Sequence, residues 1–284
     1  MSRSEDRLPF ARLLLALGAG GGRVSVEFAA RLSAQLALPL DALFIEDEDL
    51  LAVAALPVAR EVSSLGFTLP GLEPARLERD LRRHAARLQR ELQAILGDAA
   101  VQHHFEIVRG RTEISLGQAL RPGDLLVLSR EFGPFSGPRR LGSALRAALA
   151  ARWSGLLVLD EAAPLLPGPV ITCYDNSPAG ELALRLAHRL GAAQGRPMQV
   201  LLPAGDDDAR PSESELQQLA LAFGVPVPQL RRLSHSDELP TRLTGLRAGL
   251  LVLPERVVES AGVSLEQLLS QLRVPLVLLR PATK

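Results

Sequence analysis

The residues best suited to binding chemistry lie in one stretch that follows a short apolar run, Asp124–Leu128. The stretch ends in Gly-Ser just before a helical pattern, and it also contains arginines. Glycine lets backbone N–H groups approach a ligand closely, and the N-terminus of a helix favours negative charge. Arginine adds several N–H donors for phosphate oxygens. The stretch predicts a phosphate site built from Ser129, Arg130, Arg139, Arg140, Gly142 and Ser143.

A second interpretation of this stretch stays open. A glycine-rich loop can simply turn the chain, and Ser143 is of a residue type that caps helices.

The sequence gives less support to catalytic chemistry. The only lysine is Lys284, which excludes a Gly-Lys-Ser/Thr phosphate loop and a lysine Schiff base. Ser234–Asp237 contains the residue types of a hydrolase triad, but adjacent residues cannot converge on one substrate. We expect no catalytic residue and no enzyme activity.

Metal sites are also not expected. His103 and His104 are neighbours on a predicted strand, so their side chains point to opposite faces. The acidic run Glu46–Asp49 could suggest Mg²⁺, but it is better suited to the positive end of a helix beginning near Leu50. The following segment, Leu50–Gly71, is apolar and broken by proline and glycine. We expect short pieces at the carboxyl edge of a sheet, acting as a lid, a partner surface or extra core packing.

Short apolar runs alternate with amphipathic segments along the whole chain, as in a doubly wound parallel sheet. The predicted strands are Arg12–Leu17, Asp41–Ile45, Gln102–Val108, Asp124–Leu128, Leu156–Leu159, Val170–Cys173, Gln199–Leu202, Gln229–Arg232, Leu250–Leu253 and Leu276–Leu279. The predicted helices are Val24–Leu36, Arg76–Leu96, Thr112–Leu120, Ser143–Arg152, Ala179–Ala192, Glu213–Phe223, Glu238–Leu246 and Leu265–Leu272.

The second half of the chain repeats the first. Arg121-Pro-Gly-Asp-Leu-Leu-Val-Leu128 matches Arg247-Ala-Gly-Leu-Leu-Val-Leu253 with one residue deleted. Between the copies, Asp160–Pro169 holds three prolines and a glycine, which is typical of a linker. The sequence predicts two α/β domains, 8–160 and 168–281. We expect the last strand of each copy, Leu156–Leu159 and Leu276–Leu279, to lie at or near a sheet edge and to help join the two domains.

The opening of the second copy, Val170-Ile-Thr-Cys-Tyr-Asp-Asn-Ser177 followed by an alanine- and leucine-rich helix, resembles the universal stress protein family. With the tandem pattern, the resemblance covers nearly the whole chain. It implies two doubly wound five-stranded parallel-sheet domains, with an adenine nucleotide alpha hydrolase-like fold, packed as a pseudo-dimer. It also implies a non-catalytic stress-response or regulatory protein that binds ATP or AMP. The alternative is a protein-interaction scaffold that works without nucleotide.

Family members that bind ATP carry Gly-x2-Gly-x9-Gly-Ser/Thr after the fourth strand. Gly142 and Ser143 match the end of this motif, whereas its first two glycine positions hold Ser129 and Phe132. The first copy also lacks the family's aspartate after the first strand. The second copy has Asp175, expected as a helix cap, but its residues 254–274 are five fewer than the corresponding 129–154. Any nucleotide is therefore expected in the first copy, bound weakly.

Composition limits the partners and the compartment. Basic and acidic residues balance at 32 each, which argues against nucleic-acid binding by overall charge. No apolar run approaches the ~20 residues of a membrane span. The single cysteine, Cys173, cannot form a disulfide within the chain, which indicates a reducing compartment. We expect a cytoplasmic protein that binds neither nucleic acid nor membrane, with an unidentified protein partner or a second copy as its partner.

Overall fold

A computed structural model describes residues 8–20, 22–56, 60–62, 68–71, 73–97, 101–130, 142–161, 168–203, 213–223, 230–233, 241, 243, 248–262 and 264–280. The chain forms two compact units. The N-terminal unit comprises Arg12–Arg121 and Leu126–Arg152, and the C-terminal unit comprises Met1–Ala11, Pro122–Leu125 and Trp153–Lys284. The domain limits 8–160 and 168–281 stay a prediction.

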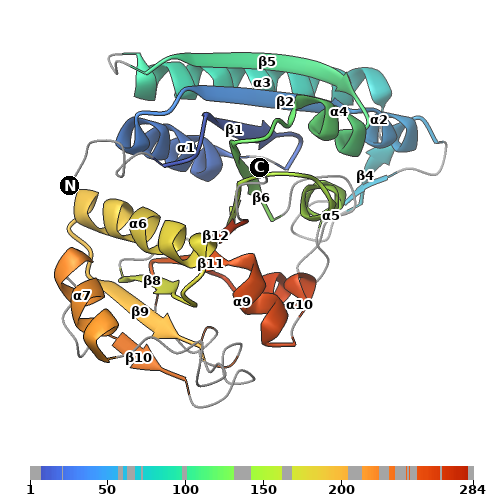
Figure 1. Cartoon of the computed structure of the whole chain (residues 1–284). Coiled ribbons are helices and arrows are strands. Elements are labelled where there is room, and N and C mark those ends of the chain that lie inside the picture. The colour runs from blue at the N-terminus through green and yellow to red at the C-terminus, as the bar shows by residue number, and fades with distance from the viewer. Residues whose placement is uncertain are drawn as a thin grey trace. The chain divides into compact units, whose positions relative to one another are not determined.

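The N-terminal unit is built on four strands, ordered β6-β1-β2-β5 (Figure 1). They are β1 (Arg12–Leu17), β2 (Leu40–Asp47), β5 (His103–Gly110) and β6 (Asp124–Ser129). β1 pairs parallel with β2, and β2 pairs parallel with β5. β6 is buried at every position and β1 at all but its first, as expected of strands covered on both faces.

Helices cover both faces of this sheet. α1 (Arg23–Leu36) packs against α3 (Pro74–Leu96), and α4 (Thr112–Ala119) packs against α5 (Ser143–Ala150). A His103 ring nitrogen lies 3.1 Å from Gln93 Oε1, which places α3 on one face of β5. A Cβ built at Gly110 would lie 2.8 Å from the Ser115 hydroxyl, which places α4 on the other face. The unit is therefore doubly wound, as the alternation of strands and helices predicted.

The segment after β2 is broken into short pieces, as predicted from its prolines and glycines. It contains the helix α2 (Glu48–Ala54) and an antiparallel hairpin of β3 (Arg60–Val62) and β4 (Thr68–Gly71). α2 begins where β2 ends, so it leaves the sheet at its carboxyl edge. Whether the segment acts as a lid or as a partner surface stays a prediction.

The C-terminal unit has the strand order β10-β9-β8-β11-β12-β7. The strands are β7 (Gly155–Leu159), β8 (Val170–Cys173), β9 (Met198–Leu202), β10 (Leu230–Arg232), β11 (Leu250–Pro254) and β12 (Leu276–Leu279). Its helices include α6 (Pro178–Ala193), α7 (Glu213–Phe223), α9 (Glu255–Ser260) and α10 (Leu265–Gln271). The predicted helix Glu238–Leu246 lies outside the described residues, except for positions 241 and 243.

β7 and β12 form the antiparallel pair of this otherwise parallel set. Leu276 lies opposite Val158 and Leu279 lies opposite Gly155, whereas β8–β9, β8–β11, β9–β10 and β11–β12 are parallel. These are the final strands of the two sequence copies, and they pair with each other. The expected sheet-edge position is wrong for β12, which pairs with β11 on one side and β7 on the other. That the two strands join two domains stays a prediction. Among the described helices, none is both long and apolar enough to cross a bilayer.

Candidate functional site

The strand order of the N-terminal unit defines where a ligand could bind. The chain passes from β1 to β2 and β5 on one side, and then returns to place β6 on the other side of β1. Ligands of open α/β sheets bind at the carboxyl ends of the strands where the order reverses. In this unit that point lies between the ends of β1 and β6, at Leu17 and Ser129 (Figure 1).

The predicted phosphate residues begin at this point. Ser129 is the last residue of β6 and is 1% exposed, and its hydroxyl makes no hydrogen bond to any described residue. Arg130 follows and is enclosed, with 4% of its surface exposed. Gly142 is buried immediately before α5, and Ser143 is the first residue of that helix. Arg139 and Arg140 lie outside the described residues, so their predicted role stays a prediction.

Two helices begin beside this point with glycine as the preceding residue. Gly22 precedes α1 and Gly142 precedes α5, and neither can supply a side-chain cap. The starts of α3, α4 and α9 also have no side-chain cap, whereas Asp47 caps α2, Ser177 caps α6 and Ser264 caps α10. A helix start without a side-chain cap has N–H groups that an anion can satisfy. The geometry of β6 and α5 is thus suited to an anionic group near Ser129.

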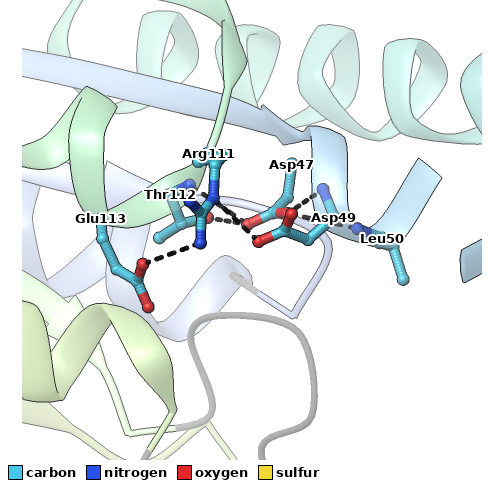
Figure 2. A network of polar contacts seen from close by, with 6 residues as sticks. All are labelled: Asp47, Asp49, Leu50, Arg111, Thr112 and Glu113. Atoms are coloured by element: carbon cyan, nitrogen blue, oxygen red, sulfur yellow. Dashed lines mark hydrogen bonds and ion pairs between the residues drawn. The ribbon is translucent and has the colours of Figure 1, made fainter. Parts of the chain in front are cut away.

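A separate polar network lies at the ends of β2 and β5, and Figure 2 shows its members. Asp47 Oδ1 accepts hydrogen bonds from the backbone N–H groups of Asp49, at 2.8 Å, and Leu50, at 3.2 Å, which caps α2. Asp47 Oδ2 accepts from the backbone N–H of Thr112, at 3.3 Å, and from its hydroxyl. One carboxylate therefore holds the first turns of α2 and α4 together.

Arg111 forms ion pairs at the surface side of this network. Arg111 Nε lies 3.3 Å from Asp49 Oδ2, and Arg111 also lies 3.7 Å from Glu113 Oε2. The sequence predicted that acids of this run serve a helix start, and the cap at Asp47 confirms it. The partnership with Thr112 was not predicted, because the two residues are far apart in sequence. In the described residues, no group of three or more His, Cys, Asp or Glu side chains is placed to hold a metal ion.

In the C-terminal unit, the residues after β8 serve the following helix. The Asp175 carboxylate accepts hydrogen bonds from the Ser177 backbone N–H, at 3.2 Å, and hydroxyl, at 2.5 Å. The Ser177 hydroxyl in turn accepts from the Gly180 N–H at 3.0 Å and caps α6. Asp175 was expected to be the cap itself. It instead orients Ser177, because Asp175 lies two positions too early to be the residue that flanks the helix.

The position that corresponds to the phosphate loop is closed in this unit. α9 begins directly after β11, and its first residue, Glu255, pairs with Arg280 through two N–H groups, one of them at 2.7 Å. The Arg280 guanidinium also lies 3.8 Å from the centre of the Trp153 ring. A fixed carboxylate therefore stands at the start of α9, where a phosphate would need a positive or neutral surface.

No family model matches the chain, and no curated protein matches it in sequence. Solved structures do match. A universal stress protein from Archaeoglobus fulgidus DSM 4304 aligns with a TM-score of 0.59 at 13% identity, over 97% of this chain and 98% of that one. A universal stress protein candidate from Pseudomonas aeruginosa UCBPP-PA14 aligns with a TM-score of 0.59 at 12% identity, over 99% and 96%.

A functionally unknown protein from Pseudomonas aeruginosa PAO1 is similar to the same degree, with a TM-score of 0.57 at 14% identity over 99% and 95% of the two chains. Identities this low establish the fold alone. The chain has the α/β fold of universal stress proteins, with a mostly parallel sheet, and the resemblance stated from the sequence is confirmed at that level.

Proposed function

We propose that this chain is a universal stress protein-like regulatory protein, non-catalytic and cytoplasmic, whose first copy binds an adenine nucleotide weakly. Its two copies would form a pseudo-dimer of five-stranded domains, 8–160 and 168–281. The observation that carries the nucleotide proposal is the Ser129 hydroxyl, which is buried at the end of β6 and makes no hydrogen bond to a described residue. Buried hydroxyls are normally hydrogen-bonded. A buried hydroxyl without a protein partner among the described residues, at the point where the strand order reverses, therefore favours binding of a ligand there.

The contrast between the copies supports the first as the binding one. The start of α5 has glycine and serine, and the loop before it contains Arg139 and Arg140. The start of α9 has Glu255, whose charge is neutralised by Arg280. A phosphate would have to compete with this carboxylate for Arg280 and to draw Arg280 away from both Glu255 and the Trp153 ring.

The proposed role of the bound nucleotide is regulatory and not catalytic. No described carboxylate or imidazole among the predicted site residues could act as a general base toward a water at the phosphates. We therefore expect binding of ATP or AMP without turnover.

Titration calorimetry of the full chain with ATP tests the proposal. Ser129→Ala removes one hydrogen bond to a charged group, which is worth ~1.5–3 kcal/mol, so the affinity should fall at least about tenfold. Thr172→Val is the matched control, because Thr172 in β8 is also fully buried and its hydroxyl also has no partner among described residues. Equal losses in the two variants, or binding unaffected by Ser129→Ala, would contradict the proposed site.

A nucleotide-independent interaction scaffold is the second candidate, and the burial of Arg130 favours it. A guanidinium that is 4% exposed is not presented to solvent for a phosphate. Under this alternative the purified full chain would release no nucleotide on denaturation, as measured by mass spectrometry, and ATP would give no heat of binding.

A further inference from the structure

The outer strand of the N-terminal unit, β5, has a long open edge (Figure 1). It pairs with β2 over eight residues in continuous register, and no described strand pairs with its other side. The pairing has no bulge, the strand contains no proline or lysine, and its charged residues are Glu106 and Arg109. Proteins usually protect edges with these devices or with very short strands, because an open edge pairs readily with another chain. At the opposite end of the strand order, β10 spans only Leu230–Arg232.

The backbone groups that face this edge belong to alternate residues. The Leu40 N–H donates to the Gln102 carbonyl at 2.9 Å, so the backbone of Gln102 faces β2. Residues along a strand alternate in the neighbour that their N–H and C=O groups face. The backbone groups of His104, Glu106 and Val108 therefore face β2, and those of His103, Phe105, Ile107 and Arg109 point to the open edge.

Three of these residues, Phe105, Ile107 and Arg109, are evenly spaced about Ile107. Ile107 is 47% exposed, which is high for a large apolar side chain in a strand. Phe105 lies two residues before it and Arg109 two residues after it, and all three share one face of the strand. An aromatic residue and a cationic residue therefore lie two positions to either side of a central apolar residue. The Arg109 guanidinium also pairs with Glu78 of α3.

We propose that β5 pairs antiparallel with β5 of a second copy of this chain, about a two-fold axis that passes between the two Ile107 residues. In this register the two Ile107 side chains pack on each other. Phe105 of each copy lies opposite Arg109 of the other, an arrangement in which a cation meets an aromatic ring. Three opposed residue pairs would exchange about six backbone hydrogen bonds. The sheets of the two N-terminal units would then be continuous.

Neither a register shifted by one residue nor a strand from a different protein fits this edge equally well. A two-fold axis at Glu106 would place two carboxylates directly opposite each other, which is destabilising. A foreign strand would need its own aromatic and cationic residues at the matching spacing, whereas β5 contains both halves of the set. A second copy is therefore the occupant that the sequence of this edge fits.

Sedimentation of the full chain over a range of concentrations tests the proposal, and a dimer is expected. Ile107→Glu should raise the dimer dissociation constant by about 10- to 100-fold, since it sets like charges against each other. Ile107→Pro should do the same by removing an N–H that points away from β2, so the pairing with β2 is kept. The control is Ile114→Glu on α4, where an isoleucine that is 51% exposed is changed away from the edge. It should leave the dimer intact.

Cross-linking tests the register. Opposed residues of a hydrogen-bonded antiparallel pair have Cα atoms about 5.5 Å apart, which is within the range that a disulfide spans. Ile107→Cys should therefore give a covalent dimer on mild oxidation, and Ile114→Cys should not. The native Cys173 is fully buried and would not compete. A monomeric wild-type chain, or a dimer insensitive to both Ile107 substitutions and not cross-linked by Ile107→Cys, would overturn the proposal.

Discussion

Replacing Asp47 by alanine is expected to destabilise the N-terminal unit more than any exposed change in the same network. The Asp47 side chain is 6% exposed, and its two oxygens serve α2 and Thr112 (Figure 2). Loss of a helix cap costs ~0.5–2 kcal/mol. A hydrogen bond to a charged acceptor contributes ~1.5–3 kcal/mol, and Thr112, at 3% exposed, would be left buried without that acceptor. The expected loss is about 2–5 kcal/mol in the free energy of unfolding.

Urea unfolding followed by far-ultraviolet circular dichroism measures this loss. Asp49→Ala is the control, because Asp49 pairs with Arg111 at the surface, where 49% of the Asp49 side chain is exposed. Exposed ion pairs contribute at most ~1 kcal/mol, so this variant should differ little from wild type. A double-mutant cycle of Asp47→Ala with Thr112→Val should show clear coupling between the two sites. Losses of equal size at Asp47 and Asp49, or additive effects of the cycle pair, would refute the two-helix role of this carboxylate.

Three further predictions concern the C-terminal unit and a matched control. Gly180→Ala should destabilise the protein by about 1–3 kcal/mol in thermal unfolding, because the new Cβ would meet the Asp175 carboxylate and lie 3.2 Å from the Asp175 nitrogen. The control is Gly117→Ala in α4, where the new Cβ meets nothing within 4 Å, and this variant should be more stable by up to ~1 kcal/mol. Burial raises the pKa of Tyr174, with nearby carboxylates adding to the effect, so its absorbance should titrate above the unfolded value of ~10 and stability should fall as pH rises through that window. Burial also raises the pKa of the Cys173 thiol, so it should resist alkylation at pH 8 until the protein is unfolded; rapid labelling of folded protein would contradict this.

Much of the fold could be predicted because its strands are covered on both faces. β1, β8 and β12 have the predicted bounds, since each is a short apolar run with polar or turn residues at its ends. α9 was not predicted, because a helix of six residues is too short for a periodic pattern. The hairpin of β3 and β4 was missed for a similar reason, as neither strand exceeds four residues.

The candidate site was predictable only where its residues are close in sequence. Ser129 and Gly142 follow one strand and precede the next helix, so local pattern located both of them. The hydrogen bond between Asp47 and Thr112 joins the ends of two neighbouring strands. The ion pair of Glu255 with Arg280 joins residues 25 positions apart. Such contacts depend on strand order and register, which the sequence pattern alone did not specify.

The antiparallel pairing of β7 with β12 has a consequence for synthesis of the chain. β7 is buried at every position in the folded protein, and its partner β12 is made about 120 residues later. At translation rates of ~5–20 residues per second, the ribosome needs about 6–24 s to cover that interval. During this time one side of an apolar strand has no partner from its own chain, and strands in that state aggregate with neighbours. The nascent chain should therefore be most dependent on chaperones between the synthesis of β7 and that of β12.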